Sequence, residues 1–203
     1  MGIYKNLKDA LLLPNDVTTL KLKINKGHLP QELFCFTYLE ELFLEGSGTI
    51  HPPAHFEGFE NLKRLTLKGF DLQDSIQRFW EIPTLNNLKI IDGKLERLLL
   101  PLSNYPALEF LTIKNTGLEE IPMEISHLVN LQELTVIENR VHKLPVGIMD
   151  LTDLKRLNLD NNQITFLPDW LKNHPSLKAM SLDQNPLSEE EKERIEREFH
   201  LWF

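Results

Sequence analysis

Apolar residues recur along this chain in one fixed pattern. In the unit that begins at Leu131, the apolar positions are Leu131, Leu134, Val136, Val141, Leu144, Ile148 and Leu151. The early alternation, with a period of two, predicts a short strand with one face turned inward. The later spacing of three to four residues predicts a helical or 3₁₀ turn that closes the same core from the other side.

This unit repeats along most of the sequence. Its first residue is Val17, Leu39, Leu62, Leu85, Leu108, Leu131, Leu154 and Leu177 in eight successive copies, so the interval is 22 residues once and 23 residues six times. A single unit cannot bury its own apolar residues, and stacking on its neighbours is what buries them. We therefore expect the strands of successive units to lie side by side in one parallel sheet.

A polar position follows each predicted strand. The ninth residue of the unit is asparagine in half of the copies: Asn25, Asn139, Asn162 and Asn185. An amide side chain both donates and accepts, so it can satisfy backbone groups that the inward turn removes from water. We predict a ladder of asparagines joining neighbouring repeats.

The ladder is expected to be irregular around residues 70–93. Ser47 and Thr116 are expected to replace asparagine in part, whereas Phe70 and Gly93 cannot. Phe70 is predicted to join an aromatic stack instead. A leucine at position 93 is expected to cost less stability than one at position 162, because glycine has no side chain to lose.

The full pattern, LxxLxLxxNxLxxLPxxIxxLxx, resembles the leucine-rich repeat family. It is similar to the subtype that carries LPxxIxxL on its convex side, as in IPMEISHL at 121–128 and LPVGIMDL at 144–151, and to small bacterial proteins of this kind. The resemblance covers the chain from about Val17 to Asn185. It implies an α/β solenoid of about eight 22–23-residue repeats with a parallel β-sheet on the concave face, short helical or 3₁₀ turns on the convex side, and helical caps at both ends.

One domain is expected over residues 1–203, with an N-terminal cap at 1–16, repeats at 17–187, and a C-terminal cap helix and final strand at 188–203. In the N-terminal cap, LKDALLLPND predicts a short amphipathic helix that ends at Pro14. Its expected core contacts are Leu7, Leu11 and Leu12.

The C-terminal cap begins with a helix signal. Ser188 and Glu191 have the spacing of a capping box, and the acidic residues that follow suit the first turn of a helix. Ile195 and Phe199 are predicted to face the last repeat, and Trp202 to cover it from the final strand. Two segments depart from the repeat pattern: 70–84 predicts a longer convex helix, and at 95–105 Leu99 or Leu100 is free to face solvent or a partner while Leu98 and Leu102 enter the core.

Composition narrows the class of protein and the compartment. A net charge of −8 argues against a binder of nucleic-acid phosphates. The one cysteine, Cys35, allows no internal disulfide, and we expect it to be a small apolar filler. No signal peptide or membrane-inserting run is evident. A cytoplasmic monomer is expected, or a secreted or surface-exposed protein if Met1-Gly2 replaces a removed signal peptide.

No group of residues has the pattern of a catalytic or metal site. His51 and His55 have helical spacing, but Pro52 and Pro53 oppose a helix between them and no third ligand is close in sequence. A shallow curved sheet also offers no deep pocket in which catalytic groups converge. We expect no enzyme activity, no metal and no cofactor.

The outward strand positions form the face that can bind a partner. Ile91, Phe110 and Ile137 lie in neighbouring repeats beside small threonines, and lysines towards the amino end give way to Asp160 and Asp183 towards the carboxyl end. Apolar residues on a polar face mark contact sites, and a charge gradient orients a partner. The candidate partner-binding residues are Phe43, Arg64, Lys68, Lys89, Ile91, Phe110, Thr112, Lys114, Glu133 and Ile137.

The predicted function is therefore that of a non-catalytic protein–protein interaction module that binds an unidentified protein or peptide on its concave sheet. The resemblance leaves two alternatives open. One is an exported bacterial protein that contacts a host molecule, and the other is a regulatory subunit of an enzyme.

Overall fold

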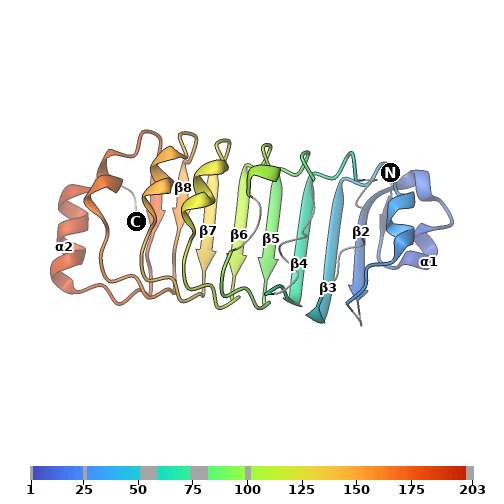
Figure 1. Ribbon diagram of the computed structural model, residues 1–203, viewed down its shortest axis with the longest axis horizontal. Helices are drawn as coiled ribbons and strands as arrows, with labels where there is room; N and C mark the ends of the chain where they lie inside the picture. Colours follow the sequence, from blue (N-terminus) through green and yellow to red (C-terminus); the bar gives the residue numbers. More distant parts are fainter. Residues whose placement is uncertain (1, 25–26, 51–58, 74–81, 99–101, 200–203) are drawn as a thin grey trace.

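The computed structural model contains one open sheet of nine parallel strands in which each strand lies next to its neighbours in sequence (Figure 1). The structure describes residues 2–24, 27–50, 59–73, 82–98 and 102–199. The strands are β1 Gly2–Tyr4, β2 Val17–Ile24, β3 Glu41–Thr49, β4 Arg64–Asp71, β5 Asn87–Ile91, β6 Phe110–Lys114, β7 Glu133–Ile137, β8 Arg156–Asn158 and β9 Ala179–Ser181. The predicted leucine-rich repeat solenoid is confirmed.

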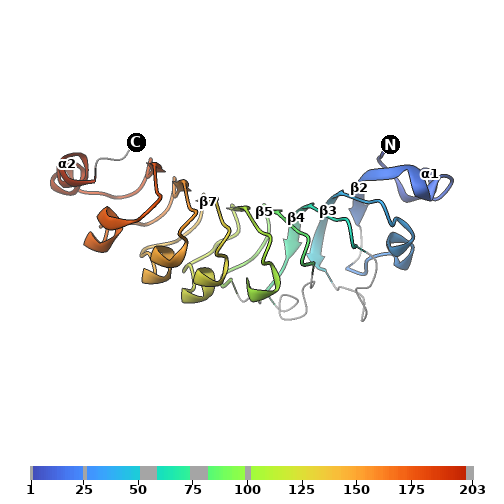
Figure 2. The same ribbon diagram turned by 90° about the horizontal axis from the view of Figure 1, so that it is seen from above.

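Short 3₁₀ turns lie on the outer side of the arc and the strands on its inner side (Figure 2). Strand alternation explains this arrangement, because Leu134 and Val136 are fully buried while the residues between them face away from the core. The turns are η1 Pro14–Asp16, η2 Gln31–Cys35, η4 Leu102–Asn104, η5 Met123–His127, η6 Val146–Asp150 and η7 Asp169–Asn173. Proline precedes η2, η5, η6 and η7, as the LPxxIxxL motif predicts.

The N-terminal cap differs from the sequence expectation. Helix α1 spans only Leu7–Ala10, with the Asn6 side chain accepting a hydrogen bond from the Asp9 amide at 2.8 Å. Ala10 is fully buried, whereas Leu11 and Leu12 are 38% and 74% exposed, so the predicted core contacts of these two leucines are wrong. The reason is β1, which the sequence did not reveal: it pairs with the outer edge of β2 and takes the place that a longer helix was expected to cover.

A left-handed residue follows each strand from β5 to β9. Asp92, Asn115, Glu138, Asn161 and Gln184 have positive φ angles of 50–61°, and they recur every 23 residues at the eighth position of the repeat. A positive φ turns the chain sharply at the end of the strand. This turn points the next residue, at the ninth position, into the core.

The ninth-position asparagines bond across the turn to the repeat before them. Asn162 Oδ1 accepts from the Val141 amide at 3.1 Å, and its Nδ2 donates to the carbonyl oxygens of Val136, Leu159 and Asp160 at 2.7, 2.9 and 3.2 Å. Asn139 makes the equivalent bonds one repeat earlier and also accepts from the buried Thr116 hydroxyl. Asn25 lies outside the described residues.

The first half of the sheet replaces the ladder with glycines. Ser47 is exposed and does not take the role of an asparagine. Phe70 is buried, and its ring lies where a Cβ on Gly46 would come within 2.5 Å of it. A Cβ at Gly93 would lie 2.5 Å from the Phe70 carbonyl oxygen, so a leucine there has a steric cost that the sequence does not reveal. Strands β3 and β4 continue past the point at which β5–β9 turn.

Two departures from the repeat pattern have different outcomes. Leu98 and Leu102 are buried, as predicted for the dense apolar run. Three other predictions lie outside the described residues. They are the helix around Ile76, Phe79 and Trp80, the position of Leu99 and Leu100, and the final strand with Trp202.

Helix α2, Glu189–Glu198, covers the last repeat. Ile195 and Phe199 are buried as predicted, and Ser188 Oγ accepts from the Glu191 amide at 3.1 Å. The carboxylate of Glu191 does not complete a capping box. It accepts from the Leu167 amide at 2.9 Å and bonds the Arg194 guanidinium, which in turn donates to the Leu167 carbonyl oxygen at 2.6 Å.

Glu191 and Arg194 together satisfy the backbone amide and carbonyl of Leu167, which a further repeat would otherwise bond. Arg194 also reaches Asp169 Oδ1 at 2.8 Å and lies over the ring of Phe166 at 4.6 Å. The bond from Arg194 lowers the pKa of the buried Glu191 carboxyl, which therefore stays ionised. Side chains of α2 thus replace a ninth repeat at this end.

A histidine changes the outer turn that leads into the last repeat. In earlier repeats the turn closes with a backbone bond, such as Leu154 N–H to the Leu151 carbonyl oxygen at 2.9 Å. In the last repeat the Leu177 amide instead donates to Nδ1 of His174 at 3.1 Å, and Nε2 of His174 lies 3.0 Å from the Ile148 carbonyl oxygen. Nδ1 must be unprotonated to accept, so the imidazole is neutral.

Acidification is expected to destabilise the last repeat through His174. Burial lowers the pKa of His174 below its ordinary value, and the bond to Ile148 opposes this only in part. The unfolded chain therefore binds a proton first, so the stabilisation is present above about pH 6.5 and is lost as the pH falls below that value. Urea unfolding between about pH 7 and pH 5 measures the slope. His174→Leu should flatten it, whereas His142→Asn at an exposed site should not; equal slopes in all three proteins contradict the argument.

Candidate partner-binding face

The predicted partner-binding residues all lie on β3–β7 and face away from the core. Arg64 and Lys89 are exposed, and the others are partly buried by their neighbours on the sheet. Because the strands pair in register without a shift from β4 to β9, each column of outward residues crosses the sheet in a straight line. The face is therefore a regular array of side chains, with one column for each outward position of the repeat.

Register divides the three apolar residues that the sequence places in neighbouring repeats. Phe110 aligns with Asn87 and Glu133 at the start of the strands, whereas Ile91 and Ile137 align with Lys114 at their ends. Four residues of strand separate Phe110 from that column, roughly 13 Å. The apolar anchors therefore lie on both margins of the face with Thr112 and Thr135 between them.

Ion pairs between neighbouring strands offset much of the positive charge at the lysine-rich end of the face. Glu45 lies 3.6 Å from Lys23 Nζ and 3.3 Å from Lys68 Nζ, and the bond to Lys68 lowers the pKa of the Glu45 carboxyl. Arg64 pairs with Glu41 at 3.4 Å, and Lys114 with Glu138 at 3.0 Å. Within the described chain, Lys21 and Lys89 are outward lysines of this face without an ion pair. The charge gradient is thus weaker than the sequence suggests.

The carboxyl-terminal part of the face holds a depression. About 370 Å³ of space lies over β7–β9, lined by Glu133, Thr135, Arg156, Leu157, Asn158, Ala179, Met180 and Ser181. Of these only Glu133 was among the candidate residues. The signal in the sequence is Ala179, whose small side chain follows Glu133 and Arg156 in a column that is otherwise made of larger residues.

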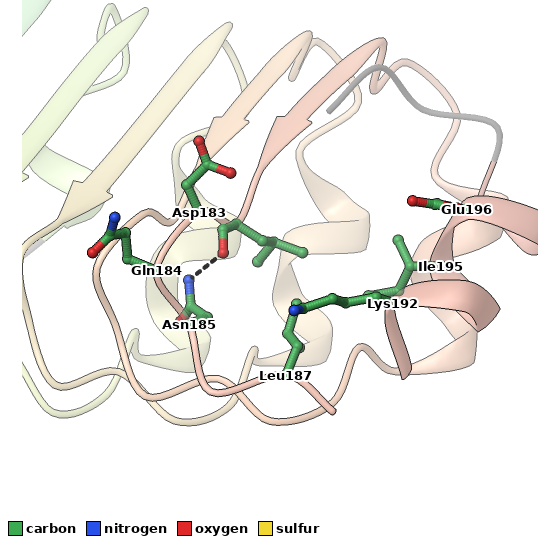
Figure 3. A pocket seen from close by; sticks show the side chains of 8 residues that line it. Asp183, Gln184, Asn185, Leu187, Lys192, Ile195 and Glu196 are labelled. Carbon is green, nitrogen blue, oxygen red and sulfur yellow. Dashed lines mark hydrogen bonds between the residues drawn. The ribbon is translucent and has the colours of Figure 1, made fainter. Parts of the chain in front are cut away.

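A second hollow, of about 390 Å³, lies between the last turn of the sheet and α2 (Figure 3). Asp183, Gln184 and Asn185 line one side, and Lys192 and Ile195 of the helix line the other. The Asn185 amide donates to the Leu182 carbonyl oxygen at 2.9 Å, so its polar groups serve the turn. This hollow is open at the end of the solenoid.

The other candidate features of the sequence are the histidines, the cysteine and the apolar segments. Among the residues that the structure describes, no three His, Cys, Asp or Glu side chains gather as metal ligands; His51 and His55 lie outside them. Cys35 is exposed, so its predicted role as an apolar filler is wrong. No helix in the described ranges is both long and apolar enough to cross a membrane.

Three solved structures place this fold among known proteins. A leucine-rich repeat protein of Leptospira interrogans has a TM-score of 0.77 and 27% identity, covering 93% of this chain and 48% of its own. An internalin of Listeria monocytogenes has a TM-score of 0.61 and 20% identity, and the match covers 97% of this chain and 69% of the internalin. A plant peptide hormone receptor in complex with RGF2 has a TM-score of 0.58 and 22% identity, and the match covers 90% of this chain and 34% of the receptor. The chain thus spans about half the length of the Leptospira protein.

Sequence comparisons give the family directly. No curated protein sequence matches the chain. The family model described as a leucine-rich repeat region matches residues 96–198, about half of the chain, and this stretch holds strands β6–β9 and the asparagine bonds. The chain belongs to the leucine-rich repeat family.

Proposed function

We propose that this chain is a non-catalytic interaction module that binds a protein or peptide on the inner face of its sheet. The observation that carries the proposal is the face itself: outward side chains of β3–β8 stand in aligned columns and are accessible to a partner. Leucine-rich repeat proteins are in general protein-interaction scaffolds, and the similar plant receptor is in complex with RGF2. Both support binding to a protein or peptide.

Phe110 and Ile137 are the proposed anchors. Both are partly buried and point away from the core, so a partner can remove their remaining surface from water without disturbing the fold. Apolar and aromatic residues that a partner buries carry most of the binding energy of an interface.

Phe110→Ala combined with Ile137→Ser is expected to weaken partner binding by about 2–4 kcal/mol. The partner is first captured from the source cell with a photo-crosslinker at Thr112, then purified and titrated by calorimetry. Met123→Ala with Val129→Ser is the matched control, because these residues are 50% and 52% exposed on the outer side. Equal affinity of the inner-face variant and the wild type, with unchanged melting, places binding elsewhere and overturns the proposal.

A cytoplasmic setting is proposed for this module. Its support is the exposed thiol of Cys35, which a reducing compartment keeps free. Cell fractionation with an antibody against the chain tests the compartment, and recovery from the medium or the cell surface contradicts it.

A further inference from the structure

The depression over β7–β9 has a built-in set of hydrogen-bond donors. Arg156 donates to Glu133 through Nε at 2.7 Å and through Nη2, so this pair fixes the guanidinium against one wall. Among the described residues, Nη1 of Arg156 and Nδ2 of Asn158 have no acceptor. Ala179, next to Arg156 in register, leaves the space in which an acceptor can reach both groups.

The two margins of this depression differ in polarity. At the start of the strands lies Arg156, which pairs with Glu133 and keeps Nη1 as a further donor. At the end of the strands lie Asp160 and Asp183, with Ser181 donating to Asp160 Oδ1 between them. Lys114, the cation of this margin, already pairs with Glu138.

The separation of the two margins follows from the strand. Residues 156 and 160 are four positions apart, roughly 13 Å along an extended backbone. An extended peptide has the same rise, so side chains four positions apart in a partner match the two margins. Thr135, Asn158 and Ser181 on the floor leave room for small residues between them.

We propose that this depression binds an extended peptide segment with an acidic residue and a basic residue four positions apart. The acidic side chain meets Arg156 Nη1 and Asn158 Nδ2, and the basic side chain meets Asp160 and Asp183. This inference rests on the proposed binding to the inner face and names the chemistry of the partner there. A simple anion fits less well, because Glu133 and Asp160 border the same space.

Synthetic peptides test the inference without an identified partner. The probe is a heptapeptide of Ser and Thr that carries one Asp and one Lys four positions apart. One comparison peptide places Asp and Lys next to each other, and the other omits both. Titration into ¹⁵N-labelled protein is followed through the Asn158 side-chain amide and the backbone amides of Thr135 and Ser181. The spaced peptide is expected to shift these signals and to bind about five-fold more tightly than the adjacent-charge peptide.

Two variants and one control locate the site. Ala179→Leu fills the depression without a change of charge, and Asp183→Lys reverses one margin; each is expected to weaken the spaced peptide about five-fold. Lys143→Glu, on a side chain that is 65% exposed away from this face, should leave binding unchanged. Binding that ignores charge spacing, shifts confined to other residues, no shift at all, or tighter binding of inorganic phosphate each overturns the inference.

The captured partner separates this inference from the function on which it rests. If Phe110→Ala with Ile137→Ser weakens the partner but Ala179→Leu and Asp183→Lys do not, the inner face binds through other chemistry and only the inference fails. If none of these variants weakens it, the proposed function fails as well.

Discussion

Asn162→Leu is expected to lower the free energy of unfolding by about 3 kcal/mol. The side chain is 2% exposed and satisfies the Val141 amide and the Val136 carbonyl oxygen, both of which would be left without a partner in a dry interior. Leucine has a similar size, so packing changes little and the loss reports the hydrogen bonds. Chemical unfolding of the purified protein measures it.

Asn185→Leu is the matched control for this prediction. Asn185 makes the same kind of bonds, accepting from the Ile164 amide and donating to Leu159 and Leu182, but it lines the open hollow beside α2. Water can replace its side chain there, so its loss should be clearly smaller than that of Asn162. Equal losses at both sites would show that burial of the ladder does not set its strength.

Removal of residues 188–203 is expected to have the largest effect, about 5 kcal/mol of lost stability together with self-association. Ile195 and Phe199 leave the core, and the outer edge of β9 and the Leu167 backbone become exposed. Unfolding curves and light scattering after size exclusion report the two losses. A truncated chain that stays monomeric with unchanged unfolding shows that α2 is no cap.

A single substitution tests how α2 acts. Arg194→Ala removes the partner of the buried Glu191 and two contacts to Leu167 and Asp169, so most of the loss should appear without the deletion. Arg197→Ala is the matched control, because its side chain is 67% exposed and pairs only with Glu198 among the described residues. If both variants unfold alike, the cap depends on apolar burial alone.

The repeat period was sufficient to predict the sheet because every unit has the same apolar positions. A strand with Leu134 and Val136 inward has one possible neighbour on each side, namely the same strand of the next repeat. Prediction failed at the N-terminal end of the repeats. Leu7, Leu11 and Leu12 are equally apolar, and only the pairing of β1 with β2 decides which of them reach the core.

The candidate face was predicted in part for the same reason. Alternation alone tells which residues point outward, and this holds for Phe110 and Ile137. Alternation does not tell which outward residues pair with each other. Two features depend on neighbours 22–23 residues away and on rotamers, which a single sequence does not reveal. They are the contact of Glu45 with two lysines and the depression beside Arg156.

The bonds of the asparagine ladder also limit how such a chain can grow. They connect residues 21 and 26 positions apart, and the side chains of the inner face pair at a separation of 23. Duplication or loss of one whole 23-residue unit keeps every one of these partners, whereas an insertion of any other length within the ladder breaks several at once. Evolution of this molecule can therefore change its length in whole repeats while each surviving turn keeps the geometry that it has here.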